Sequence, residues 1–106
     1  GLGDVYKRQA SAAGVNAAAL GTKASAANLN SFALGSSATA SANNASAIGV
    51  SSTASGTNAS AFGISSTASN VNSVAIGANS LSSQQNSIAI GIDSEGLEKL
   101  YIGKSA

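Results

Sequence analysis

The sequence predicts an all-β solenoid whose coils are fourteen residues long, and two periodic features support this prediction. A glycine recurs every fourteen residues, and an asparagine stands five residues before each glycine. The glycines are Gly21, Gly35, Gly49, Gly63, Gly77 and Gly91. The asparagines are Asn16, Asn30, Asn44, Asn58, Asn72 and Asn86. A period of this length is too short for helical repeats, which need roughly thirty residues or more, but it accommodates two strands and two tight turns.

Each coil is predicted to contain two short strands, because side chains alternate in two segments of the repeat. In the segment 72–77, Val74 and Ile76 share one face while Ser73 and Ala75 share the other, which is the two-residue period of a strand. The segment 51–55 alternates in the same way. A disordered Ala/Ser tract is the alternative interpretation, but disorder does not require one fixed period in six successive copies.

The asparagines and glycines are predicted to form the corners between these strands, because both residue types tolerate positive φ. Successive coils would stack about 4.8 Å apart, with each strand pairing in parallel with its copy in the next coil. Equal spacing then places like residues in columns. We therefore expect the asparagine column to form a ladder of side-chain amides.

The large apolar residue before each glycine is predicted to point into the coil. Alanine and serine alone would leave space between two sheets packed about 10 Å apart. The predicted core residues are Leu20, Leu34, Ile48, Phe62, Ile76 and Ile90. The competing assignment places these residues on a seam between subunits and the small residues inside the coil.

Both ends of the chain depart from the repeat. Residues 1–9, GLGDVYKRQ, break its register and match the in-frame translation of a transposon-end sequencing adapter, so we interpret them as a non-native segment. A genuine short basic cap is the alternative interpretation. Residues 10–94 are predicted to form the six glycine-marked coils, and residues 95–106 a divergent coil or the start of a connector. We interpret the chain as an internal fragment of a longer protein.

The composition argues against several kinds of chemistry. The chain contains no Cys and no His, and its formal net charge is +1. It therefore lacks the usual metal ligands and general base, and it has no basic surface for nucleic acid. Asp93, Glu95 and Glu98 could supply oxygens to Ca²⁺, but no Asp-x-Asp-x-Asp-Gly loop accompanies them. We expect no enzyme activity, no metal, no cofactor and no nucleic-acid partner.

The segments Asn72–Gly77 (NSVAIG) and Asn86–Gly91 (NSIAIG) resemble the head repeat of trimeric autotransporter adhesins of the YadA-like type. The resemblance covers Ala10 to about Ser94. It implies a left-handed parallel β-roll that assembles as a homotrimer. It also implies display on the outer membrane of a Gram-negative bacterium, through a C-terminal anchor that is missing from this sequence. The implied function is attachment to host extracellular matrix, cells or surfaces, with a role in virulence.

The second strand of the repeat offers candidate ligand-facing residues, because its hydroxyl side chains recur in columns. These residues are Thr39, Thr53, Thr67, Ser41, Ser55 and Ser69. Adhesion through many weak contacts is one interpretation of this pattern. A second interpretation is an ice-binding β-solenoid that uses the Thr/Ser ladder, although Leu81 interrupts the threonine column. A third is that the hydroxyls only keep the rod soluble.

Overall fold

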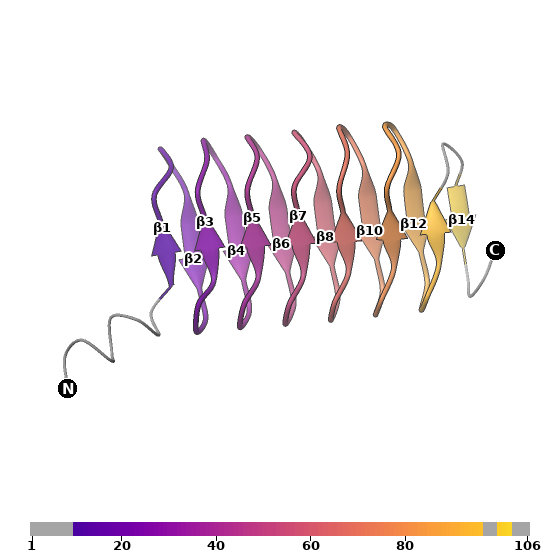
Figure 1. The fold of residues 1–106 in the computed structure, drawn as a ribbon, viewed down its shortest axis with the longest axis horizontal. Coiled ribbons are helices and arrows are strands. Elements are labelled where there is room, and N and C mark those ends of the chain that lie inside the picture. The colour runs from indigo at the N-terminus through magenta and orange to yellow at the C-terminus, as the bar shows by residue number, and fades with distance from the viewer. Residues whose placement is uncertain (1–9, 97–99, 103–106) are drawn as a thin grey trace.

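The chain folds as a parallel β-solenoid made of two sheets that face each other (Figure 1). The computed structural model describes residues 10–96 and 100–102. Sheet A contains β1 (Ser11–Ala12), β3 (Ser25–Ala26), β5 (Thr39–Ala40), β7 (Thr53–Ala54), β9 (Thr67–Ala68), β11 (Leu81–Ser82) and β13 (Glu95–Gly96). Sheet B contains β2 (Ala18–Leu20), β4 (Phe32–Leu34), β6 (Ser46–Ile48), β8 (Ser60–Phe62), β10 (Val74–Ile76), β12 (Ile88–Ile90) and β14 (Leu100–Ile102). The described residues thus confirm the predicted all-β solenoid with two strands per coil.

The register of both sheets follows the sequence repeat. In sheet A, Thr39 pairs with Thr53, which pairs with Thr67. In sheet B, each strand from β2 to β10 pairs with the strand fourteen residues later. The pairing changes only between β12 and β14, where Ile88 faces Leu100, twelve residues later. The adapter-like segment 1–9 and the greater part of segment 95–106, including Glu98, lie outside the described residues.

Small residues fill the interior of every described coil. In one coil, Ser52 and Ala54 from sheet A face Ala59 and Ala61 from sheet B, and all four side chains are fully buried. The other buried hydrophobic residues are also alanines, and the other buried polar residues are serines. The Cα trace is only 13 Å across in its thinnest direction. Tight turns at both corners hold the two sheets close together, so a larger side chain has no room between them.

The prediction that the large apolar residues form the core is therefore wrong. Leu20 is 68% exposed, and Phe62 and Ile76 are also exposed. Leu34, Ile48 and Ile90 are only partly buried. The predicted alternation was correct, but the two faces of the strand were assigned the wrong way round. The error came from assuming a standard separation of about 10 Å between packed sheets, whereas a fourteen-residue coil closes around alanine and serine.

Buried serines stabilise the turns that precede the strands. The Oγ of Ser52 donates a hydrogen bond to the carbonyl of Gly49 at 2.8 Å, and the Oγ of Ser73 donates to the carbonyl of Asn70 at 2.7 Å. Within the described residues, every buried side-chain nitrogen or oxygen has a hydrogen-bond partner. The interior can therefore contain serine without the cost of an unpaired buried hydroxyl.

The glycine corner combines a special backbone conformation with close contact between coils. The six repeat glycines have φ between 123° and 132°. A Cβ on Gly49 would lie 2.6 Å from the carbonyl oxygen of Gly63 in the next coil. Any residue with a Cβ is therefore unfavourable at this position for two reasons: the positive φ strains its backbone, and its Cβ would clash with the backbone of the next coil.

A further set of positive-φ residues was missed by the sequence analysis. Each lies two residues after a repeat glycine, with φ between 58° and 64°. These residues are Lys23, Ser37, Ser51, Ser65, Asn79 and Asp93. Four different residue types occupy this position, and serine and lysine carry no strong signal for left-handed backbone.

Replacing Gly49 by alanine should lower the free energy of unfolding by about 3 kcal/mol or more, because backbone strain and a clash act together. Guanidinium unfolding followed by far-UV circular dichroism measures this change. Val50→Ala, at the exposed adjacent position, is the matched control and should shift the midpoint little. Equal midpoints for the two variants would contradict the close contact between the glycine corners.

Candidate interaction surfaces

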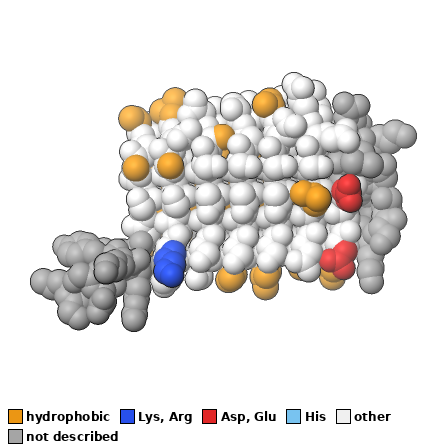
Figure 2. Space-filling view, viewed as in Figure 1, with side chains coloured by type: hydrophobic (Ala, Val, Ile, Leu, Met, Phe, Trp, Pro, Cys, Tyr) orange, Lys and Arg blue, Asp and Glu red, His pale blue; other side chains and the backbone are white. Residues whose placement is uncertain are grey.

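The outer face of sheet A is a polar surface built from hydroxyl side chains. Thr39, Thr53 and Thr67 lie side by side in register and are partly exposed. Ser41, Ser55 and Ser69 follow these threonines by two residues, and all three are exposed. Figure 2 shows this face, with white polar side chains and backbone across its middle and most hydrophobic side chains along its two edges. The structure thus brings all six predicted ligand-facing residues to one surface, and their contact with a ligand stays a prediction.

This hydroxyl surface ends toward the C-terminus of the solenoid. Leu81 pairs with Thr67 on one side and with Glu95 on the other. The threonine column is therefore followed by an apolar residue and then by an exposed carboxylate. The hydroxyl column contains Ser11, Ser25, Thr39, Thr53 and Thr67 in register, of which only the last three are threonines. This limits any binding mode that needs a long regular row of threonines.

The outer face of sheet B is apolar, in contrast to sheet A. Its main column contains the six residues that the sequence analysis had placed in the core: Leu20, Leu34, Ile48, Phe62, Ile76 and Ile90. Beside this column, Phe32 is exposed and Val74 and Ile88 are partly buried. Side-chain volumes compensate within a strand, since the small Ser60 and the large Phe62 both lie on β8. An extended apolar surface of this kind is typical of a contact with another protein chain.

The asparagine corner carries the predicted ladder. The Nδ2 of each repeat asparagine from Asn16 to Asn72 donates to the Oδ1 of the asparagine fourteen residues later, at distances from 3.0 to 3.3 Å. All six asparagines have φ between 56° and 63°. Their amides are consumed in bonds along the rod, so we assign this column to structure and not to ligand binding.

The described residues offer little reactive chemistry. They contain no group of three or more His, Cys, Asp or Glu side chains placed to hold a metal ion. Of the three carboxylates considered for calcium, Asp93 lies at the glycine corner and Glu95 on the sheet A face, both exposed. The surface formed by residues 10–96 and 100–102 has no pocket. The same residues include no helix that is long and apolar enough to cross a membrane.

Comparison with protein families supplies an independent finding. The profile described as the YadA head domain repeat, in two copies, matches residues 12–38, 26–52, 40–66, 54–80 and 68–94. Together these overlapping matches cover residues 12–94, which are the coils that the structure shows. A comparison with individual curated proteins gives no match.

Proposed function

Because the chain belongs to the YadA head repeat family, we propose that it is the head module of a trimeric autotransporter adhesin on the surface of a Gram-negative bacterium. In this role it attaches the cell to host matrix, host cells or surfaces. The observation that supports a binding module best is the arrangement of its two broad faces. One is apolar and suited to contact between chains, and the other is polar and suited to contact with a ligand.

The apolar face supports assembly as a homotrimer. A single chain leaves the column from Leu20 to Ile90 partly or largely exposed. Covering it with equivalent faces of two further chains would remove this apolar area from water, and such burial is the main driving force for stable association. The interior of alanine and serine contributes less hydrophobic stabilisation per coil, so the association would also stabilise the solenoid.

Replacing Ile48 by threonine should weaken this assembly, because it places a hydroxyl in the middle of the apolar face while retaining a β-branched side chain. Sedimentation equilibrium of the 106-residue chain should give the mass of a trimer, and the Ile48→Thr variant should dissociate at roughly tenfold higher protein concentration or more.

The matched control is Thr53→Val, which makes the reverse exchange on the face of sheet A. It should leave the trimer mass unchanged. A monomeric unaltered chain, or equal effects of the two substitutions, would contradict assembly through sheet B.

The polar face supports the adhesive contact. Thr39, Thr53 and Thr67 present hydroxyls in one row, one per coil, with a spacing of about 4.8 Å. Each hydroxyl contact is weak, but three chains per head and many heads per cell multiply such contacts. Neither enzyme activity nor ice binding gains support from the family assignment, since the matching profile describes adhesin head repeats.

Replacing Thr39, Thr53 and Thr67 together by lysine should reduce attachment of the purified chain to matrix-coated polystyrene by roughly tenfold or more, because it disrupts three repeated contacts at once. The matched control places three lysines on the asparagine corner, at Asn43, Thr57 and Gln85, which are all exposed. Equal attachment by the two triple variants would show that the sheet A face is not the adhesive surface.

A further inference from the structure

Two asparagines of the ladder begin a motif for the attachment of a sugar. The segments 44–46 and 58–60 both read Asn-Ala-Ser, which fits the pattern Asn-x-(Ser/Thr) of asparagine-linked glycosylation. No other asparagine of the chain is followed two residues later by serine or threonine. Asn44 and Asn58 are neighbours in the ladder, and both are exposed. The motif therefore falls on side chains that solvent reaches.

The ladder takes one of the two amide hydrogens of each of these asparagines. The Oδ1 of Asn44 accepts from Asn30 at 3.1 Å, and its Nδ2 donates to Asn58 at 3.0 Å. Asn58 in turn donates from its Nδ2 to Asn72 at 3.1 Å. A side-chain amide carries two N–H hydrogens. One hydrogen on each Nδ2 is therefore left over after both ladder bonds of the residue have formed.

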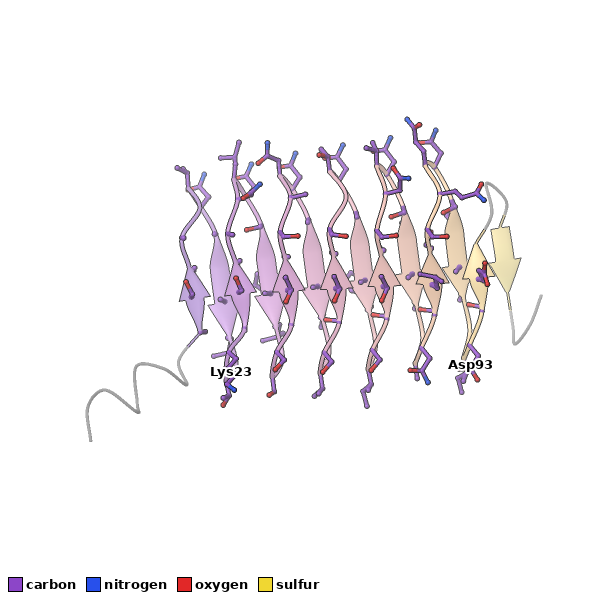
Figure 3. The ribbon with its side chains drawn as sticks, in the orientation of Figure 1. Lys23 and Asp93 are labelled. Carbon is purple, nitrogen blue, oxygen red and sulfur yellow. The ribbon has the colours of Figure 1, made fainter. Side chains whose placement is uncertain are left out.

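The remaining hydrogen points away from the rod. The amide accepts from the coil on one side and donates to the coil on the other, so its C=O and its donating N–H are antiparallel, as in a planar trans peptide group. In such a group the second substituent on nitrogen continues the chain outward. Figure 3 shows the asparagine corner as the edge opposite Lys23 and Asp93, with side chains that project from the solenoid. A sugar on Nδ2 would extend in this direction, and both ladder bonds would be kept.

The surroundings of the two asparagines are polar and open. Asn43 and Thr57 precede them, and both are exposed. In the coils immediately before and after, the same position is apolar, with Leu29 and Val71. Successive coils lie about 4.8 Å apart, so we expect one sugar ring at each site rather than a branched glycan.

The third residue of the motif departs from its column in the same two coils. Ser46 and Ser60 lie on the outer face of sheet B and are partly buried. Ser46 pairs with Phe32 on one side of the two coils, and Ser60 pairs with Val74 on the other. Two hydroxyls thus interrupt an otherwise largely apolar column. A sugar transferase requires a hydroxyl at this position, whereas an apolar contact through sheet B gains nothing from it.

We propose that Asn44 and Asn58 are acceptor sites for asparagine-linked glycosylation, and that the folded solenoid carries the sugars without breaking its asparagine ladder. In the transfer, Nδ2 attacks the anomeric carbon of a nucleotide-activated hexose. The N–C bond forms as the bond between the anomeric carbon and the phosphate oxygen breaks. Nδ2 loses one proton, and the nucleoside diphosphate leaves with the electron pair.

The proposal does not depend on trimer assembly, but it sets an order of events if the trimer forms. Ser46 and Ser60 lie on the face that a trimer would cover. The transferase would therefore act on the chain before assembly, and the sugars would then remain on the asparagine corner.

Production of the 106-residue chain together with a soluble asparagine-specific transferase that uses UDP-glucose tests the proposal. Intact mass spectrometry counts the hexoses, and electron-transfer fragmentation places them. The unaltered chain should carry hexoses at Asn44 and Asn58 and on no other asparagine. A synthetic peptide of residues 41–48 is the positive control for the activity of the transferase.

Three substitutions separate the motif from the ladder position. Ser46→Ala and Ser60→Ala should each remove the hexose from one site, while every ladder asparagine stays in place. Phe32→Ser is the matched gain of a site, because it creates the motif at Asn30, which occupies the same ladder position. This variant should carry a third hexose.

Unfolding measures whether the sugars fit the ladder. Guanidinium midpoints followed by far-UV circular dichroism should agree for the glycosylated and unglycosylated chains, because both ladder bonds of each modified asparagine are kept. Asn58→Ala removes the amide and breaks two ladder bonds, so it should lower the midpoint.

Four outcomes would overturn the proposal. The first is a chain without hexoses when the peptide is modified, and the second is modification of asparagines outside the motif to the same extent. The third is a hexose that persists in Ser46→Ala or Ser60→Ala. The fourth is a glycosylated chain whose midpoint falls as far as that of Asn58→Ala, which would show that the sugar breaks the ladder. None of these outcomes concerns the mass of the assembled chain, so a failure here is distinguishable from a failure of the proposed trimer.

Discussion

The narrow interior of the coil is the constraint on which the rest of the structure depends. Four inward positions such as Ser52, Ala54, Ala59 and Ala61 are fully buried, and none could hold a larger side chain. Alanine and serine bury little apolar area, so the hydrophobic contribution of each coil is small. The regular parallel pairing of fourteen strands and the asparagine ladder accompany this small core. The large apolar residues are excluded from the interior, and they lie on the outer face of sheet B, where another chain can cover them.

The same constraint accounts for the corners. Two short strands can close into a flat coil only if the chain reverses within a few residues, and positive φ allows this reversal. At the glycine corner the backbones of successive coils approach so closely that Gly49 would clash with Gly63 if it had a Cβ. At the asparagine corner the amides instead bond along the rod. The variable positions beside both corners are thereby held in columns. Residues that share a repeat position, such as Lys23 and Asp93, therefore lie a fixed number of coils apart.

Much of the fold could be predicted from the sequence, because the repeat determines register directly. The positions of Gly49 and Asn58 indicated both corners, and the alternation in the segment 72–77 indicated a strand. Which face pointed inward could not be predicted from alternation alone. Ile76 and Ala75 alternate equally well in either orientation, and the outcome depends on the separation of the sheets, which no single residue encodes. The competing assignment, with small residues inside, proved to be correct for the interior.

The candidate surfaces were predictable to different degrees. The hydroxyl column of Thr39, Thr53 and Thr67 follows from the repeat and was expected on one face. The positive φ shared by Lys23 and Asp93 was not predicted, because no single residue type marks their position of the repeat. The regular fourteen-residue spacing therefore predicted which residues form columns, but the backbone geometry of the corner could not be predicted from it.

The central claim is that small residues fill the interior and large residues lie outside. The most direct test compares the equilibrium unfolding of two variants, Ala61→Val and Ser60→Val. The two substitutions enlarge adjacent residues of β8 that point to opposite faces. Ala61→Val should lower the free energy of unfolding by about 1–3 kcal/mol or more through overpacking, whereas Ser60→Val should change it little, because Val74 already occupies the equivalent outer position. Strong destabilisation by Ser60→Val with tolerance of Ala61→Val would place the interior on the other face and contradict this account.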